Sequence, residues 1–169
     1  MNENSPIIKA ITHCVQHYNH EKYWKMREYT VSSKGSLIKK LYYLFQIKKM
    51  DAYNCASFGT HLGCGAEFKS VPQLPHGIRG IFISHNAKIG NNLRMYQQVT
   101  IGEGNGGAPV VGDDVFIGAG AKILGNIKIG NNVRIGANCV VVEDIPDNAT
   151  VVMNKPRVII RKAENSGKE

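Results

Sequence analysis

The feature that most constrains the fold of this chain is a six-residue repeat of large aliphatic side chains. The repeat runs in two blocks, Ile83, Ile89, Met95 and Ile101, and then Val111, Ile117, Ile123, Ile129, Ile135 and Val141. Glycine follows this residue in six of the ten hexads, and the fifth place is small or apolar everywhere except at Asn105. Such a hexad forms one short strand and its turn, and three of them close a triangular coil. The sequence therefore predicts a prism of stacked parallel strands with the aliphatic residues inside.

Two breaks interrupt the repeat, and both are candidate functional segments. We call the large aliphatic residue of each hexad its anchor. In the first break, the anchors Ile101 and Val111 are ten positions apart where six are expected, and the extra residues form a glycine-rich loop at 104–107. In the second, nine residues separate Leu74 from Ile83, and this segment contains His76. Loops extruded from a regular solenoid are often functional. A Rossmann or all-helical fold is disfavoured because segments with a period of 3.6 residues are missing between the strands.

The first sixty residues lack hexads and have the pattern of two helices. Ser5 and Pro6 suit the start of one helix, and Ser36 suits the start of a second. The apolar stripe of the second helix consists of Leu37, Leu41, Leu44 and Phe45. We expect these helices to cover one end of the prism, because the open edge of a solenoid needs a cap.

The predicted organisation has three parts. They are an N-terminal helical cap at 1–56, a β-helix domain at 57–160 and a polar tail, expected to be disordered, at 161–169. Within the second part we expect stacked coils from about Leu62 to Val142. Pro146 then closes the repeat, because proline cannot donate a hydrogen bond to a following coil.

Composition is that of a soluble single-domain protein and leaves its partner open. No apolar run approaches the length of a membrane span, and no signal-peptide pattern opens the chain. The net charge of +8 and the pI of 9.4 favour an anionic partner: nucleic acid, a membrane surface or a phosphorylated cofactor. The four cysteines are scattered without zinc-type spacing, which indicates reduced thiols and a cytoplasmic location.

Two weaker patterns near the N-terminus have plainer explanations. His13, His17 and His20 could present three nitrogens to a metal on one helix face, but no carboxylate or cysteine reinforces them. We favour a plain helix surface and expect no metal. The aromatic and basic segment 39–49 could lie on an anionic membrane, although packing on the solenoid or on a neighbouring chain is commoner. The basic residues are spread along the chain with no nucleic-acid module, so we expect no nucleic-acid partner.

Four motifs in the hexad region match a known family. They are Leu74-Pro75-His76 and residues 98–102, 117–126 and 135–137. Through these motifs the stretch from Leu74 to Ile159 resembles the hexapeptide-repeat acetyltransferases, specifically the serine acetyltransferase branch. It is also similar to short acetyltransferases of capsule and exopolysaccharide pathways. The resemblance implies a mainly β fold, a left-handed parallel β-helix with a small N-terminal helical region, together with a homotrimer and acetyl-CoA as co-substrate.

The resemblance places the family's catalytic histidine at His76, on a coil break facing the neighbouring subunit. Acetyl transfer requires the acceptor hydroxyl to lose its proton as its oxygen attacks the thioester carbonyl. An imidazole, with an ordinary pKa near ~6.5, can accept that proton at neutral pH. The alternative is a histidine that only satisfies turn carbonyls. We predict that His76 is the general base.

Three departures from the serine acetyltransferases bear on the acceptor. Where that family has a second histidine after its glycine-rich loop, this chain has Ala108. The family's acidic partner of the base falls on His61, and an aspartate near its amino-acid substrate falls on Pro75. These differences favour a sugar hydroxyl over L-serine, with His61 as a candidate residue on the acceptor side.

The resemblance also implies a groove for CoA between adjacent prisms. Backbone groups at Gly102, Ala119 and Ala137 would bond the pantetheine arm, because small residues let the cofactor approach the coil. Lys155 and Arg157 could pair with the phosphates, or could be solvated surface charges.

The leading hypothesis from the sequence is an acetyl-CoA-dependent O-acetyltransferase that acts on a sugar of a surface polysaccharide or its precursor. Serine O-acetylation in cysteine biosynthesis is the alternative within the same class. A non-catalytic β-helix binding or scaffold protein is the alternative from another class. His76 on a break, together with the intact Gly-Ala-Gly-Ala run at 118–121, argues against that last alternative.

Overall fold

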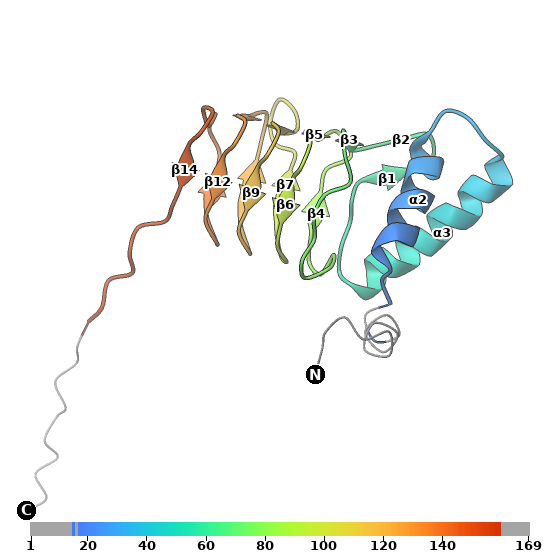
Figure 1. Cartoon of the computed structure of the whole chain (residues 1–169), viewed down its shortest axis with the longest axis horizontal. Coiled ribbons are helices and arrows are strands. Elements are labelled where there is room, and N and C mark those ends of the chain that lie inside the picture. Colours follow the sequence, from blue (N-terminus) through green and yellow to red (C-terminus); the bar gives the residue numbers. More distant parts are fainter. Residues whose placement is uncertain (1–14, 16, 160–169) are drawn as a thin grey trace, which may run out of the picture.

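The molecule consists of a helical pair followed by a solenoid of short strands (Figure 1). The computed structural model describes Val15 and residues 17–159. Helices α2 (His20–Val31) and α3 (Leu37–Tyr53) lie at one end, and an extended segment leaves the solenoid at the other end. The predicted first helix from Ser5, together with His13 and the tail 161–169, lies outside the described residues.

Fourteen strands follow the helices in the described part of the chain. They are β1 (Thr60–His61), β2 (Cys64–Gly65), β3 (Glu67–Phe68), β4 (Phe82–Ile83), β5 (Lys88–Ile89), β6 (Arg94–Met95), β7 (Thr100–Gly102), β8 (Val110–Val111), β9 (Phe116–Ile117), β10 (Lys122–Leu124), β11 (Lys128–Ile129), β12 (Arg134–Ile135), β13 (Val140–Val141) and β14 (Thr150–Val151). Each strand is only two or three residues long, so pairing with the coils above and below is what stabilises it.

The strands form three parallel sheets of four strands, one for each side of the prism. Sheet I has the order β13-β10-β7-β4, sheet II the order β11-β8-β5-β3 and sheet III the order β14-β12-β9-β6. The register stacks each hexad anchor on the next, so that Ile101 pairs with Ile123, which pairs with Val141. The predicted left-handed parallel β-helix is confirmed.

The interior of the prism holds the aliphatic anchors of the repeat. All ten are at most 3% exposed, from Ile83 to Val141. Ile123, at the centre of sheet I, is fully buried between Ile101 and Val141. Burying such a side chain contributes roughly 1.5–3 kcal/mol, and the repeat supplies ten of them in one continuous core.

The two ends of the solenoid differ from the prediction. Leu62 is exposed at the turn of the antiparallel hairpin β1–β2, which interrupts the stack. Parallel pairing begins ahead of this hairpin, where Ser57 pairs with Phe82, and continues after it with β3 and β5. At the other end, β14 pairs with β12 after Pro146, so the proline does not end the stack. Proline is tolerated here because it lies in a connection between strands and not inside one.

The predicted boundaries at 1–56 and 57–160 remain predictions. The helices α2 and α3 fall within the first range and all strands fall within the second.

The corners of the prism explain which polar residues the repeat contains. Asn92, Asp114, Asn132 and Asn138 stand at corner positions with a positive φ of 52° to 58°. Asparagine and aspartate tolerate this left-handed conformation better than other non-glycine residues. The glycines that follow six of the anchors are explained by the spacing of the coils. A Cβ at Gly118 would lie 2.6 Å from the backbone nitrogen of Ala137, so adjacent coils approach too closely for a side chain.

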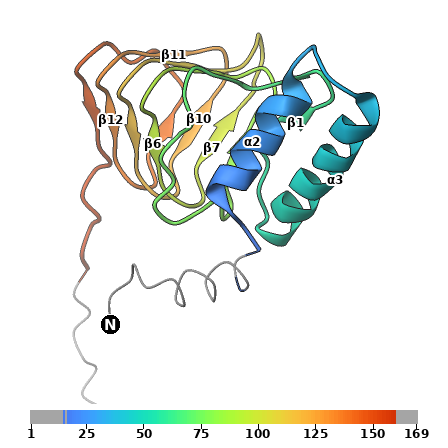
Figure 2. The same ribbon diagram turned by 45° about the vertical axis from the view of Figure 1, so that its right-hand side comes forward.

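Helix α2 closes the first coil, and α3 packs on the far side of α2 (Figure 2). The Arg27 guanidinium donates hydrogen bonds to the backbone oxygens of Phe58 at 3.1 Å and Ala66 at 2.6 Å, which ties the helix to the chain entering the solenoid. Tyr23, Trp24 and Phe58 fill the space between them with ring centroids 5.4–5.8 Å apart. The predicted capping role of the helical part therefore belongs to α2.

Helix α3 does not pack its apolar stripe on the solenoid, which was one of the two expected partners. Leu41 and Phe45 are exposed, and packing on a neighbouring chain, the other expected partner, stays a prediction. The side that packs inward carries Lys40, Ile47 and Asp51 instead. The physical reason is that Asp51 accepts a hydrogen bond of 2.7 Å from the buried Tyr23 hydroxyl, which orients this side of α3 towards α2.

Candidate active site

His76 lies at the corner where the first coil passes from sheet III to sheet I. Gln73 pairs with Arg94 on one side of this corner, and β4 begins on the other side. The extra residues of the break contain Ile78, which is fully buried and anchors the segment to the core. The His76 side chain is exposed. The break thus turns one apolar residue inward and leaves an imidazole at the surface.

Gln97 of the next coil holds this imidazole. The His76 Nδ1 and the Gln97 Oε1 are 2.7 Å apart, and the Tyr96 ring meets the imidazole edge-on at 5.1 Å between centroids. An amide oxygen only accepts hydrogen bonds, so the proton must sit on Nδ1. The Nε2 atom is then left with a lone pair that can accept a proton. The sequence analysis did not single out Gln97, because the six-residue repeat gives no information about the side-chain contact between Gln97 and His76.

Two of the predicted CoA-binding residues lie on the same corner in successive coils. The backbone oxygen of Gln97 accepts a hydrogen bond from Gly120, beside Ala119, and the oxygen of Ala119 accepts one from Asn138, beside Ala137. We call this line of residues, His76, Gln97, Ala119 and Ala137, the His76 edge. The structure therefore brings the predicted base together with two of the small residues predicted to bind the pantetheine arm.

A groove on sheet I adjoins the His76 edge. It has a volume of about 600 Å³ and is lined by Gly80, Phe82, Gln98, Thr100, Gly120, Lys122, Asn138 and Val140. Phe82 and Val140 are exposed and give the groove apolar walls. The Lys122 Nζ atom donates hydrogen bonds to the backbone oxygens of Gln98 at 2.8 Å and Gly120 at 3.1 Å. An elongated ligand with an apolar arm fits such a surface.

Gly102 and His61 lie at a different corner, where the chain passes from sheet I to sheet II. Gly102 ends β7 next to the glycine-rich loop. The His61 ring is 5.5 Å from that of His85, which follows β4 at this same corner. The Glu103 carboxylate accepts hydrogen bonds here from Ser84 and Asn86. Within one chain, sheet I separates these residues from His76, so the structure does not bring His61 or Gly102 to the predicted base.

The predicted phosphate-binding cations also lie apart from His76. Lys155 and Arg157 are exposed in the segment 152–159, which contains neither helix nor strand. This segment runs away from the solenoid in Figure 1. The structure does not bring either cation to the His76 edge, and their pairing with phosphate stays a prediction.

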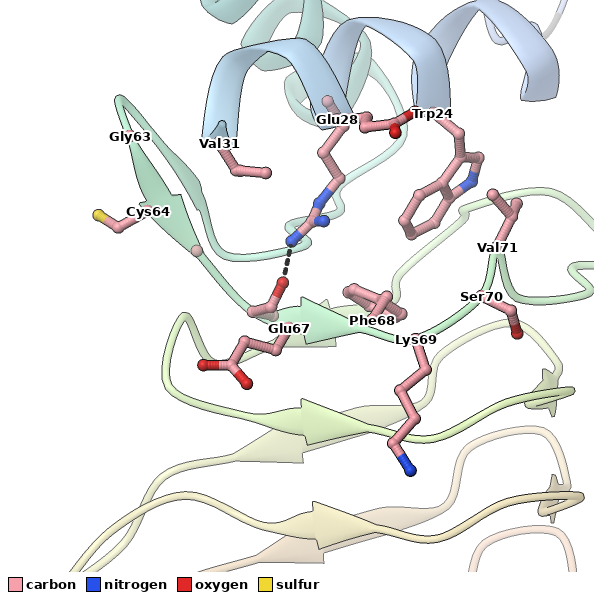
Figure 3. Close-up of a pocket in the computed structure, with 13 residues that line it drawn as sticks. Trp24, Glu28, Val31, Gly63, Cys64, Glu67, Phe68, Lys69, Ser70 and Val71 are labelled. Atoms are coloured by element: carbon pink, nitrogen blue, oxygen red, sulfur yellow. Dashed lines mark hydrogen bonds between the residues drawn. The ribbon is translucent and has the colours of Figure 1, made fainter. Parts of the chain in front are cut away.

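A second pocket, of about 590 Å³, lies between α2 and the start of the solenoid (Figure 3). Trp24, Arg27, Glu67 and Phe68 are among its lining residues. Burial lowers the pKa of Arg27 to about 10, which leaves the guanidinium charged at neutral pH. The guanidinium lies 4.7 Å from the centroid of the Phe68 ring and donates hydrogen bonds to backbone oxygens. Its contacts are those of a structural anchor, so this pocket is not the candidate active site.

The described residues contain neither a candidate metal site nor a helix suited to crossing a membrane. No group of three or more His, Cys, Asp or Glu side chains in this part of the chain could hold a metal ion. His17 instead stacks on Tyr53, and His20 accepts or donates a hydrogen bond with the Tyr18 hydroxyl at 2.8 Å. None of the helices in residues 15 and 17–159 combines the length and the apolar character that crossing a membrane would need.

Comparisons with known proteins show similarity to hexapeptide-repeat transferases and to serine acetyltransferases. Residues 108–142 match the family model described as bacterial transferase hexapeptide, six repeats. A serine acetyltransferase of Staphylococcus aureus strain Mu50 is 42% identical over 98 residues, which cover 56% of this chain and 46% of that protein. The chain resembles the serine acetyltransferases. It spans about half the length of the curated relatives that it matches.

Solved structures extend the similarity to the fold. Serine acetyltransferase of Neisseria gonorrhoeae in complex with serine superposes with a TM-score of 0.57 at 36% identity, over 70% of this chain and 48% of that chain. A serine acetyltransferase in complex with CoA superposes with a TM-score of 0.61 at 28% identity, over 77% of this chain and 51% of that chain. The first of these structures contains serine and the second contains CoA. These relatives give no support to the role in polysaccharide biosynthesis that the sequence led us to expect.

Proposed function

We propose that this chain transfers the acetyl group of acetyl-CoA to a hydroxyl, with His76 as general base. The observation that carries the proposal is the hydrogen bond between His76 Nδ1 and Gln97 Oε1, because it leaves Nε2 as a proton acceptor at an exposed corner. The likeness to serine acetyltransferases, one of them in complex with CoA, supports the donor.

The reaction follows from the chemistry of a thioester and a hydroxyl. Acetyl-CoA supplies a carbonyl carbon that the acceptor oxygen attacks. His76 Nε2 takes the hydroxyl proton as the new C–O bond forms. The C–S bond then breaks, and the imidazolium returns the proton to the departing sulfur, so that CoA leaves as its thiol. Gln97 keeps the imidazole in one tautomer and orientation through this cycle.

The groove on sheet I and the His76 edge would hold the pantetheine arm. Backbone groups at Ala119 and Ala137 have only a methyl side chain beside them, which lets a ligand approach the coil. Phe82 and Val140 contribute apolar contact. Gly102, Lys155 and Arg157 stay part of the proposed CoA site only if a neighbouring chain brings them to this edge.

A homotrimer would supply that neighbour. A threefold arrangement of prisms sets the sheet I–sheet II corner of one subunit, with His61 and Gly102, against the His76 edge of the next. Such heterologous contacts close into a ring. We therefore propose that the complete site forms between subunits.

For the acceptor we propose L-serine, in line with the relatives that the chain matches. A sugar hydroxyl is the second candidate. It is favoured by Ala108, Pro75 and His61, which stand where the serine acetyltransferases carry a histidine, an aspartate and an acidic residue. One assay distinguishes the two candidates. It measures the CoA thiol released from acetyl-CoA when serine, or each of a panel of sugars, is supplied as the acceptor. Turnover of serine alone supports the first candidate, and turnover of sugars alone refutes it.

The mechanism is tested by His76→Ala in the full chain. We expect kcat to fall by about 10²- to 10⁴-fold, the usual contribution of a positioned proton acceptor, with little change in the KM for acetyl-CoA. The acid limb of the pH profile of kcat/KM should disappear in this variant. Gln97→Leu should lower kcat by about tenfold, because the imidazole loses its orienting acceptor. His17→Ala, far from the edge, is the matched control.

Two results would contradict the assignment. An active His76→Ala enzyme with an unchanged acid limb would place the base elsewhere, and His61→Ala would then test the remaining candidate. Loss of acetyl-CoA binding in His76→Ala would give this histidine a structural role.

A further inference from the structure

The outward side of α3 is apolar from Ile38 to Phe45. Ile38 is 80% exposed and Phe45 65% exposed, and Leu41 and Tyr42 between them are also largely exposed. These four residues, which we call the α3 surface, follow the spacing of three and four that places side chains on one side of a helix. The opposite side is the one that packs inward, through Ile47 and Asp51. Helix α3 therefore has an apolar surface that the described part of the chain leaves open to solvent.

The exposed charged residues of α3 itself all have one sign. Lys39, Lys48 and Lys49 are exposed, whereas Lys40 and Asp51 are buried. Asp51 is the single acidic residue of α3. Exposed cations next to exposed aromatic and aliphatic side chains are the pattern of helices that lie in the plane of a membrane surface. The lysine stems can lie along the acyl boundary while the ammonium groups reach lipid phosphates.

A second copy of the chain fits this surface less well. Two copies of α3 packed against each other would bring two lysine-rich helices together, without an exposed acidic side chain on either helix to pair with the lysines. Like charges across an interface cost affinity. An anionic lipid surface, by contrast, offers both an apolar layer and negative charge, and the whole chain carries a net charge of +8.

We propose that the α3 surface docks the protein on an anionic lipid bilayer. The helix lies flat in the headgroup region, with Ile38, Leu41 and Phe45 towards the acyl chains and the solenoid held above the membrane by α2. Helix α3 has 17 residues and is about 25 Å long at 1.5 Å per residue. In the proposed docking, this length lies along the membrane surface and does not cross the bilayer. This docking is independent of the acetyl transfer proposed above.

The test is sedimentation of the full chain with lipid vesicles. Vesicles of phosphatidylcholine and phosphatidylglycerol should carry the protein down, and those of phosphatidylcholine alone should not. The double variant Ile38→Glu/Phe45→Glu should bind at least about tenfold more weakly, since each lost contact of this size is worth about one order of magnitude. Lys48→Glu/Lys49→Glu should weaken binding and reduce its dependence on salt. Val142→Glu, exposed on the distant part of the solenoid, should bind like the parent.

Three outcomes would overturn the proposal. One is a parent protein that stays in solution with the anionic vesicles. Another is Ile38→Glu/Phe45→Glu that sediments like the parent while its circular dichroism shows it to be folded. A third is a parent protein that does not bind lipid and that light scattering shows to form a larger assembly, which is absent in this variant. The α3 surface would then be a contact between copies of the chain. Acetyl transfer should be unchanged in the double variant, which separates this test from that of His76.

Discussion

The buried carboxyl of Asp51 should make the stability of this protein fall as pH rises. Asp51 is 3% exposed and accepts a hydrogen bond from the Tyr23 hydroxyl. Burial raises its pKa from 3.8 to about 6, against the smaller lowering effects of the Tyr23 hydrogen bond, Lys48 and Arg27. Its second oxygen has no hydrogen-bond partner in the structure. The folded state therefore favours the neutral form of this side chain.

The sign and size of the effect follow from this pKa. A folded pKa above the unfolded value means that the folded chain binds the proton more tightly, so this contribution is fully present below pH 3.8 and is lost as pH rises through about 6. A shift of this size corresponds to roughly 3 kcal/mol, at 1.36 kcal/mol per pKa unit. Asp51→Asn removes the ionisation but keeps an oxygen that can accept from Tyr23.

The measurement is chemical denaturation of the parent and of Asp51→Asn between pH 4 and pH 8, at one protein concentration. We expect the variant to be more stable than the parent at pH 8 by up to about 3 kcal/mol, and the difference to shrink towards pH 4. Glu143→Gln, which removes an exposed carboxyl, should show no such trend. A difference between Asp51→Asn and the parent that stays constant with pH, or that grows towards acid pH, would refute the reasoning.

Three further predictions concern the core, the cofactor and the assembly. Ile123→Asp buries a charge inside the closed prism and should lower the free energy of unfolding by more than about 4 kcal/mol. Lys128→Asp, on the outside of β11, should lower it little. Equal melting temperatures of the two variants would disprove the assignment of inside and outside. Arg157→Ala and Lys155→Ala should raise the KM for acetyl-CoA more than they lower kcat, and an unchanged KM in both would remove them from the site. Light scattering should give a trimer at micromolar concentration; an active monomer would exclude a site between subunits.

Much of the candidate site could be anticipated from spacing. Ala137 lies 18 residues after Ala119, one full coil, so the two share a corner. Gln97 precedes Ala119 by 22 residues, which is one coil plus the four extra residues of the glycine-rich loop. His76 precedes Gln97 by 21, which is one coil plus the three extra residues of its own break. The hydrogen bond between His76 and Gln97 depends on side-chain rotamers, and a repeat carries no information about these.

The remaining site residues could not be placed in this way. Lys155 and Arg157 follow the last strand, where no neighbouring coil sets a register. His61 lies in an antiparallel hairpin that the six-residue repeat does not predict. This hairpin follows Ser57, which pairs with Phe82 of sheet I, so His61 lies at the corner after sheet I and not at the corner that carries His76.

The sequence by itself determined the solenoid, because an aliphatic residue every six positions can be buried in only one way when strands stack in parallel. It also determined that His76 stands outside the regular coils. Only the tertiary structure decided which side of α3 packs inward. Apolar residues occur all round that helix, so periodicity cannot choose between its sides. The choice was made by Tyr23, whose buried hydroxyl needs an acceptor and finds it in Asp51.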